Sequence, residues 1–102
     1  MVMLLDDTLR VLGNRYRRFA MYSVRDMENE AFTYSELLDD MVDEGYLQAE
    51  EVNRFRVQLE QNHLPVMQDS GLIEYDDRSD TIRRVPSEDV YELLDFLESF
   101  ED

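Results

Sequence analysis

The sequence predicts one mainly α-helical domain with a single small β-hairpin, and three observations support this. Apolar residues recur every three or four positions in several segments, as they do in helices that bury one face. Two short runs rich in β-branched residues flank a polar turn at residues 76–80, a pattern typical of a hairpin. With 102 residues, 43% of them hydrophobic, the chain 1–102 has apolar surface for one modest core and too little for two.

The first two predicted helices occupy residues 4–12 and 15–27. In the first, Leu5, Leu9 and Leu12 recur at helical spacing until Gly13 interrupts the pattern. Asn14 is a suitable N-cap for the second helix, because its side chain can accept hydrogen bonds from the first-turn backbone. The second helix has an apolar face and outward arginines: the face is Tyr16, Phe19, Ala20, Ser23 and Met27, and the arginines are Arg15, Arg18 and Arg25.

A short strand and a third helix are expected next. Residues 28–31 are predicted to form a loop and residues 32–34 a very short strand. Ser35 is the predicted N-cap of the third helix, and Gly45 suits its C-terminal end. The predicted buried face of this helix consists of Leu37, Leu38, Met41 and Val42.

The fourth predicted helix begins near Ala49 and ends at Gly71. Its apolar stripe is Val52, Phe55, Leu59 and Val66. Pro65 should kink or split this helix, because proline lacks a backbone donor and clashes with the preceding turn. Residues 72–75 and 81–85 then form the hairpin.

The last predicted helix is opened by Pro86, Ser87 and Glu88. Its apolar side is wider than a single small core requires, and it consists of Val90, Leu93, Leu94, Leu97 and Phe100, with Tyr91 and Phe96 at its edges. We therefore divide the chain into a core, residues 4–85, and a C-terminal dimerisation helix, residues 86–100. The predicted dimer interface joins the first and last helices through Leu5, Leu9, Val90, Tyr91, Leu94, Leu97 and Phe100. The alternative is that the last helix folds back on its own domain.

The charge of the chain is unusual. It carries 25 acidic residues against 10 basic ones, for a net charge of −15, and every basic residue is arginine. Such an excess repels itself in dilute buffer, whereas molar salt shortens the screening length to about 3 Å. Acidic excess without lysine therefore favours a protein adapted to high salt. The alternatives are an ordinary acidic protein or one that binds a basic partner.

The predicted order of elements is helix, helix, short strand, helix, helix, hairpin, helix, which is the order of a winged helix-turn-helix with an additional C-terminal helix. Three segments carry a closer resemblance: LDDTLRVLGNRYRRFAMYSV, TYSELLDDM and HLPVMQDSGLIEYD. Over roughly residues 4–85 the chain resembles a short winged-helix domain of salt-loving archaea, and it is similar to ArsR-like winged-helix transcriptional regulators. The resemblance implies transcriptional regulation. It implies no metal or effector site. The metal sites of ArsR-like proteins need cysteines or clustered histidines, which this sequence lacks.

In a winged helix the helix that begins near Ala49 would enter the major groove of double-stranded DNA. If its apolar stripe faces inward, the side chains that project outward are Arg54, Val57, Gln58 and Gln61, with Arg56 to one side. Arginine can bond to guanine, glutamine to adenine, and valine can contact a thymine methyl group. The alternative is an ordinary solvated helix.

Further basic residues could contact the DNA backbone, and we expect this of Arg15, Arg17 and Arg18 and of Arg83 and Arg84. Their alternative role is pairing with nearby carboxylates. The predicted hairpin tip argues against phosphate contact, because it holds three aspartates beside Arg78. We therefore keep two hypotheses: a homodimeric DNA-binding regulator, and a winged-helix protein-interaction module without DNA binding.

Catalysis and cofactor binding are not expected. The chain has no cysteine and one histidine, so it offers no nucleophilic dyad, disulfide or clustered metal ligands. His63 stands among apolar neighbours and is interpreted as a packed residue. No apolar run suits a membrane span, and MVMLL is followed at once by Asp6 and Asp7, unlike a signal peptide. We expect a cytoplasmic protein without a small-molecule effector.

Overall fold

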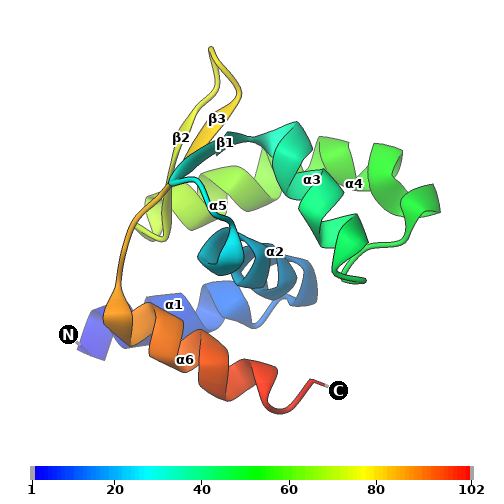
Figure 1. Cartoon of the computed structure of the whole chain (residues 1–102). Coiled ribbons are helices and arrows are strands. Elements are labelled where there is room, and N and C mark those ends of the chain that lie inside the picture. Colours follow the sequence, from blue (N-terminus) through cyan, green and yellow to red (C-terminus); the bar gives the residue numbers. More distant parts are fainter. Residues whose placement is uncertain (1, 102) are drawn as a thin grey trace.

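The computed structural model describes residues 2–101, so Met1 and Asp102, the two ends of the predicted domain, lie outside the described residues. Two helices, α1 (Val2–Leu12) and α2 (Arg15–Asp26), are followed by strand β1 (Ala31–Thr33) and helix α3 (Tyr34–Asp43). A 3₁₀ turn (Ala49–Glu51) leads into α4 (Val52–Gln58), a π-helical turn (Leu59–His63) and α5 (Leu64–Asp69). The hairpin β2 (Ile73–Asp76) and β3 (Thr81–Arg84) precedes α6 (Glu88–Glu98). The chain is thus mainly helical with a small antiparallel sheet, as predicted (Figure 1).

Side-chain caps and glycines set the helix ends, and most were predicted correctly. The Asn14 side chain accepts hydrogen bonds from the backbone N of Tyr16 at 3.0 Å and of Arg17 at 3.2 Å. Ser87 caps α6 by accepting a bond from the backbone N of Val90 at 3.3 Å. After α3 and α5 the backbone turns at Gly45 and Gly71, whose φ angles of 82° and 75° are easily adopted only without a Cβ.

The predicted cap of α3 is wrong by two residues. Its N-cap is Thr33, whose hydroxyl accepts a bond from the backbone N of Glu36, while the backbone N of Thr33 donates to the Glu36 carboxylate at 2.8 Å. This reciprocal arrangement needs a Glu or Gln three residues after the cap. Thr33 has one in Glu36, whereas the residue three after Ser35 is Leu38.

The helix that Pro65 was expected to split is divided by a π turn just before the proline. The backbone N–H of Leu64 donates to the carbonyl of Leu59, five residues back. The wider turn moves the buried side by one position, so that it continues from Phe55 and Leu59 to His63, Leu64 and Met67. The predicted stripe is therefore buried at Phe55 and Leu59, whereas Val52 and Val66 are only half-buried.

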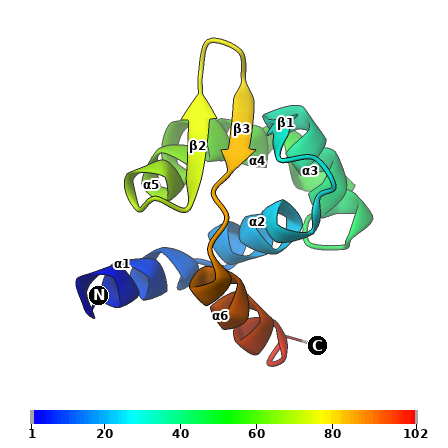
Figure 2. The same cartoon turned by 60° about the vertical axis from the view of Figure 1, so that its left-hand side comes forward.

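The hairpin is part of a three-stranded sheet in the order β1, β3, β2. Both pairings are antiparallel, and β1 places Phe32 opposite Ile82, which are both buried. Two backbone bonds extend this edge, from Tyr34 N to Asp80 O at 3.2 Å and from Arg84 N to Glu30 O at 2.8 Å. Figure 2 shows β1 beside β3, with the hairpin projecting beyond the helices.

Helix α2 lies at the centre of the core, and it is buried on more than the single face that was predicted. Residues Ala20, Met21, Tyr22, Ser23 and Val24 are all buried, because α1, α3 and α6 each pack against α2. Helix α6 contributes Leu94, which is fully buried. Helices α1 and α6 lie together at the end of the molecule opposite the hairpin tip (Figures 1 and 2). No helix within residues 2–101 is long and apolar enough to cross a membrane.

Candidate nucleic-acid interface

The outer side of α4 and the turn after it presents the four side chains that were predicted to project outward. Arg54, Val57, Gln58 and Gln61 are all exposed, and we call these four residues the reading face. Val57 is 52% exposed, and it is one of five large hydrophobic side chains that are exposed among the described residues. Phe55 and Leu59 pack inward beneath them, so the helix holds the reading face outward on a rigid base.

Arg54 and Gln58 border a hollow of about 250 Å³ between α4 and the start of α2, with Tyr16, Leu47, Glu51 and Phe55 as its other walls. The Tyr16 and Phe55 rings lie 5.1 Å apart between centroids. The Tyr16 hydroxyl donates to the Glu51 carboxylate at 3.4 Å. One edge of the reading face therefore combines two hydrogen-bonding side chains with an apolar floor and one negative charge.

His63 lies beneath this helix and is packed, as predicted. Its side chain is only 3% exposed, and its ring stacks on Phe55 at 5.5 Å between centroids. Neither ring nitrogen has a hydrogen-bond partner among the described residues. Burial, together with the positive charge of Arg17, lowers the pKa of His63. The imidazole is thus kept neutral and serves as part of the core.

Arg56 is placed differently from the reading face. It is half-buried, and its guanidinium lies over the ring of Tyr34 at 5.4 Å from the centroid. Tyr34 begins α3 and also donates the backbone bond to Asp80 in the turn of the hairpin. Arg56 therefore lies at the flank of α4, toward α3 and the hairpin. Nothing in the sequence pattern indicated the contact with Tyr34.

Two of the α2 arginines expected at the DNA backbone are used by the fold. Arg17 Nε donates to the carbonyl of Val11 at 2.9 Å, and Arg18 Nη1 donates to that of Leu12 at 2.9 Å, so both bind the C-terminal end of α1. Arg18 also donates through Nε to Glu101 at 3.0 Å. Arg15 is exposed. The predicted cluster is thus divided between structural and exposed residues.

The two arginines of β3 also have different environments. Arg84 Nη1 donates to the carbonyls of Val24, Arg25 and Met27, at 2.9, 3.1 and 2.7 Å, and so caps the C-terminus of α2. Arg83 is exposed, with Nε 3.9 Å from the Glu74 carboxylate. Of these two guanidinium groups, only that of Arg83 is oriented toward solvent.

The hairpin tip is acidic, as the sequence indicated. Asp76, Asp77, Arg78 and Asp80 are all exposed. The effect reaches Tyr75, because burial, and then the negative charges of Asp80, Glu60 and Asp77, raise the pKa of Tyr75 to about 12. A phosphate near the tip would meet a negative potential, except where an arginine offsets it.

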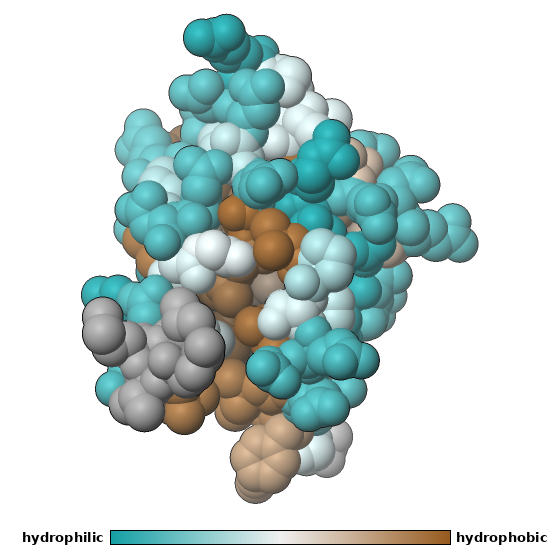
Figure 3. All heavy atoms as spheres, turned by 90° about the vertical axis from the view of Figure 1, so that its left-hand side faces the viewer, coloured by the Kyte–Doolittle hydropathy of each residue, from teal (hydrophilic) through white to brown (hydrophobic). Residues whose placement is uncertain are grey.

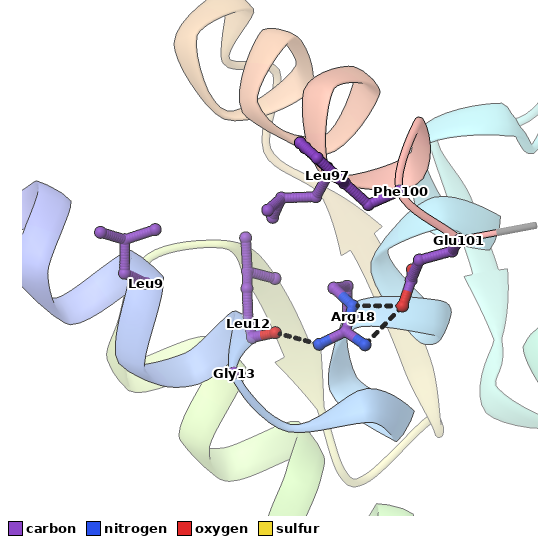
Figure 4. Close-up of a pocket in the computed structure, with 7 residues that line it drawn as sticks. All are labelled: Leu9, Leu12, Gly13, Arg18, Leu97, Phe100 and Glu101. Atoms are coloured by element: carbon purple, nitrogen blue, oxygen red, sulfur yellow. Dashed lines mark hydrogen bonds and ion pairs between the residues drawn. The ribbon is translucent and has the colours of Figure 1, made fainter.

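The opposite end of the molecule carries an apolar surface on α1 and α6. Leu5, Leu9, Phe96 and Phe100 are exposed, and Phe100 is 71% exposed. Hydrophobic residues gather on the lower half of the face in Figure 3, the end formed by α1 and α6. A groove of about 350 Å³ lies between the two helices (Figure 4), lined mostly by Leu9, Leu12, Leu97 and Phe100.

The predicted interface residues fall into three groups at this end. Leu5, Leu9 and Phe100 are exposed, and Val90, Tyr91 and Leu97 are half-buried. Leu94 is 0% exposed, so its assignment to a dimer interface is corrected here. It packs inward because α6 folds back on α2, the alternative that the sequence left open.

Ionic contacts fasten α6 to α2, and the sequence pattern did not reveal them. Glu101 accepts hydrogen bonds from Arg18 and from the Tyr22 hydroxyl, the latter at 2.7 Å (Figure 4 shows the Arg18 contact). Arg25 binds Asp95 at 3.0 Å and Glu98 at 2.8 Å. The hydrogen bonds from Arg18 lower the pKa of Glu101, whereas burial, followed by the bond to Glu101, raises that of Tyr22. Arg18 and Arg25, two of the three arginines predicted to point away from the core, therefore hold the C-terminal helix.

Residues 9–83 match the family described as "Domain of unknown function (DUF7344)". The match covers most of the chain, so the chain belongs to this family. It contains the reading face, β1, β2 and β3 as far as Arg83, whereas Arg84 and α6 lie beyond it. No curated protein and no solved structure matches the chain. Among the described residues no group of three His, Cys, Asp or Glu side chains could hold a metal ion.

Proposed function

We propose that this protein is a winged-helix DNA-binding regulator that acts as a homodimer in a salt-rich cytoplasm. The observation that carries this proposal is the reading face: Arg54, Gln58 and Gln61 are exposed together with Val57 on one side of α4 and its extension. Helix α3, the turn after it and α4 would form the helix-turn-helix, and β2 and β3 the wing.

The reading face has the chemistry of direct base recognition. The Arg54 guanidinium can donate two hydrogen bonds to O6 and N7 of guanine, and a glutamine amide can pair with N6 and N7 of adenine. Val57 would contact a thymine methyl group, and this contact would account for an exposed apolar side chain among polar ones. Each good bidentate pair discriminates against a wrong base by about 1–3 kcal/mol.

Concentrated salt reconciles the net charge of −15 with DNA as the partner. In molar salt the screening length is about 3 Å, so repulsion between the acidic hairpin and phosphates is weak. The gain from phosphate contacts falls for the same reason, because counterion release contributes less as salt rises. Affinity would then depend more on base contacts, which is the chemistry that the reading face supplies.

Homodimerisation would use the apolar end formed by α1 and α6. Exposed Leu5, Leu9, Phe96 and Phe100, together with the groove between the two helices, offer a surface that a second copy could cover. This end lies opposite the hairpin tip, so a dimer formed there leaves the hairpin and the reading face accessible. Two reading faces related by a two-fold axis would suit a pseudo-palindromic site.

A second candidate function is a protein-interaction module without DNA binding. It is favoured by the acidic hairpin tip and by Arg17, Arg18 and Arg84, whose guanidinium groups are engaged within the fold. Fewer arginines are therefore free for phosphates than the sequence suggested. The two candidates differ in whether the reading face contacts DNA.

The deciding experiment measures DNA binding in concentrated KCl. Duplexes enriched from a random library by the wild-type protein are titrated with wild type, Arg54→Ala and Gln58→Ala, and Arg10→Ala serves as the control, because Arg10 lies on α1. We expect the two reading-face variants to lose about tenfold or more in affinity for the selected duplex. The control should bind like wild type. Absence of enrichment, or no binding at any salt, would reject DNA binding and favour the interaction module.

A further inference from the structure

We propose that Tyr34 is a positioning residue that holds the Arg56 guanidinium beside the reading face for contact with a DNA phosphate. This inference rests on the DNA-binding function proposed above and assigns Arg56 a role distinct from that of Arg54, Val57, Gln58 and Gln61. Arg56 fixes the orientation of the helix on the duplex, whereas the reading face selects the sequence.

The geometry around Tyr34 supports this assignment. The Arg56 guanidinium carbon lies 5.4 Å from the Tyr34 ring centroid, within the range of a cation–π contact. The ring limits the movement of a long side chain that would otherwise sample many rotamers. The backbone N of Tyr34 is itself fixed by its 3.2 Å bond to the Asp80 carbonyl. Tyr34 thus links α3, the turn of the hairpin and the flank of α4.

The placement of Arg56 explains why it would contact a phosphate rather than a base. It is half-buried against Tyr34 of α3, while the reading-face side chains are exposed. A helix that lies in the major groove turns its outer side toward the bases and its flanks toward the two phosphate backbones. A cation held on the flank therefore meets backbone oxygens first.

The charges nearby explain why a fixed cation is useful at this position. Glu60, in the π turn, and Asp77 and Asp80, in the hairpin, all act on neighbouring Tyr75. They make this side of the molecule unfavourable for phosphates. Arg56, whose guanidinium lies over the ring of Tyr34 and so near the backbone of Asp80, adds one positive charge on this side.

The experiment is a double-mutant cycle of Tyr34→Leu and Arg56→Gln, with Tyr34→Phe and Arg10→Gln as matched controls. Binding is followed by fluorescence anisotropy over a range of KCl concentrations, on the library-selected duplex and on a scrambled duplex. The hydrogen bond from residue 34 to Asp80 uses backbone atoms only, so Leu or Phe at position 34 can still form it. The attachment of the hairpin is therefore preserved in these variants. Unfolding midpoints are measured in parallel.

We expect Arg56→Gln to reduce the slope of log affinity against log salt by about 0.9 on both duplexes, as loss of one phosphate contact requires. Tyr34→Leu should weaken binding about two- to fivefold, while Tyr34→Phe, which keeps the ring, should match wild type. In the Arg56→Gln background, Tyr34→Leu should have no further effect on affinity. A purely structural role of Tyr34 would persist in that background.

Two results would overturn the inference while leaving the proposed function intact. One is an equal loss from Tyr34→Leu in both backgrounds. The other is a changed preference between the two duplexes in Arg56→Gln with an unchanged salt slope, which would make Arg56 a base-reading residue. If the wild-type protein binds neither duplex at any salt, the proposed function itself fails, and the role of Arg56 fails with it.

Discussion

The hydroxyl of Tyr46 donates a 3.1 Å hydrogen bond to Oε2 of Glu98, and this bond ties the turn before α4 to the C-terminal helix. The Tyr46 ring stacks on Phe19 at 5.0 Å between centroids. Burial, and then the bond to Glu98, raise the pKa of Tyr46 to about 12, so the hydroxyl remains a donor at neutral pH. The segment that leads into α4 is therefore fixed by α2 and α6 together.

Tyr46→Phe should lower the free energy of unfolding by about 1–2 kcal/mol, because it removes a bond to a charged acceptor. Tyr75→Phe provides the control. The Tyr75 hydroxyl is buried and without a partner among the described residues, so its removal should be neutral or stabilising. Urea denaturation at fixed KCl compares both variants with wild type, and equal losses in the two would contradict the assigned bond.

His63 should make stability depend on pH below about 6.5. Its folded pKa lies below its ordinary value of 6.5, so as the pH falls the unfolded chain takes up this proton first. The contribution of neutral His63 is complete above that ordinary value and is lost below it, by at most about 1.4 kcal/mol per pH unit. His63→Phe should flatten the pH profile of the unfolding midpoint in this window. An unchanged profile would show that another group titrates there.

Arg84→Gln should lower the free energy of unfolding by about 1–3 kcal/mol, because three carbonyl oxygens at the end of α2 lose a charged donor. The same substitution at exposed Arg83 should change stability by less than about 0.5 kcal/mol. Thermal unfolding of the two variants in one buffer tests this difference. A destabilisation shared equally by both would remove the capping role of Arg84.

Dimerisation through α1 and α6 should be sensitive to the exposed residues and not to the buried one. Leu9→Gln combined with Phe100→Ser should give the mass of one chain by light scattering in concentrated KCl, where wild type gives that of two. Leu94→Ala instead creates a cavity and should cost about 2–5 kcal/mol of stability. A wild-type protein with the mass of one chain would reject the dimer.

The unfolding temperature should rise with KCl, because salt screens the repulsion among 25 acidic residues. The triple variant Asp76→Asn, Asp77→Asn and Asp80→Asn should show a smaller rise of the unfolding temperature with KCl, since three of those charges are removed. Asn also tolerates the positive φ of 54° at Asp80. Scanning calorimetry at several KCl concentrations measures both slopes, and parallel slopes would assign the salt effect to other carboxylates.

Local patterns in the sequence were sufficient for most of the fold. Asn14, Gly45, Gly71 and Ser87 act within one turn of their own positions, so their roles follow from residue type alone. For Arg54, Val57 and Gln58 the reading face also followed from helical periodicity, since α4 is regular as far as Gln58. Its DNA-binding role stays a prediction.

Contacts between distant segments could not be predicted from those patterns. Arg18, Arg25 and Arg84 look alike in the sequence, and only the packing of α6 and β3 against α2 shows that they hold the structure together. The burial of Leu94 and the meeting of Tyr34 with Arg56 have the same origin. A periodic pattern identifies an apolar face without indicating which of several partners covers it.

The π turn before Pro65 gives the two halves of the continuous helical segment, residues 52–69, different buried sides. An uninterrupted α-helix would keep a single inward direction from Val52 to Asp69, and His63, Leu64 and Met67 would not all reach the interior together. The additional residue in the turn rotates the side chains of α5 about the helix axis relative to those of α4. One continuous segment can therefore present polar residues to a partner along its first half and anchor the hairpin through its second.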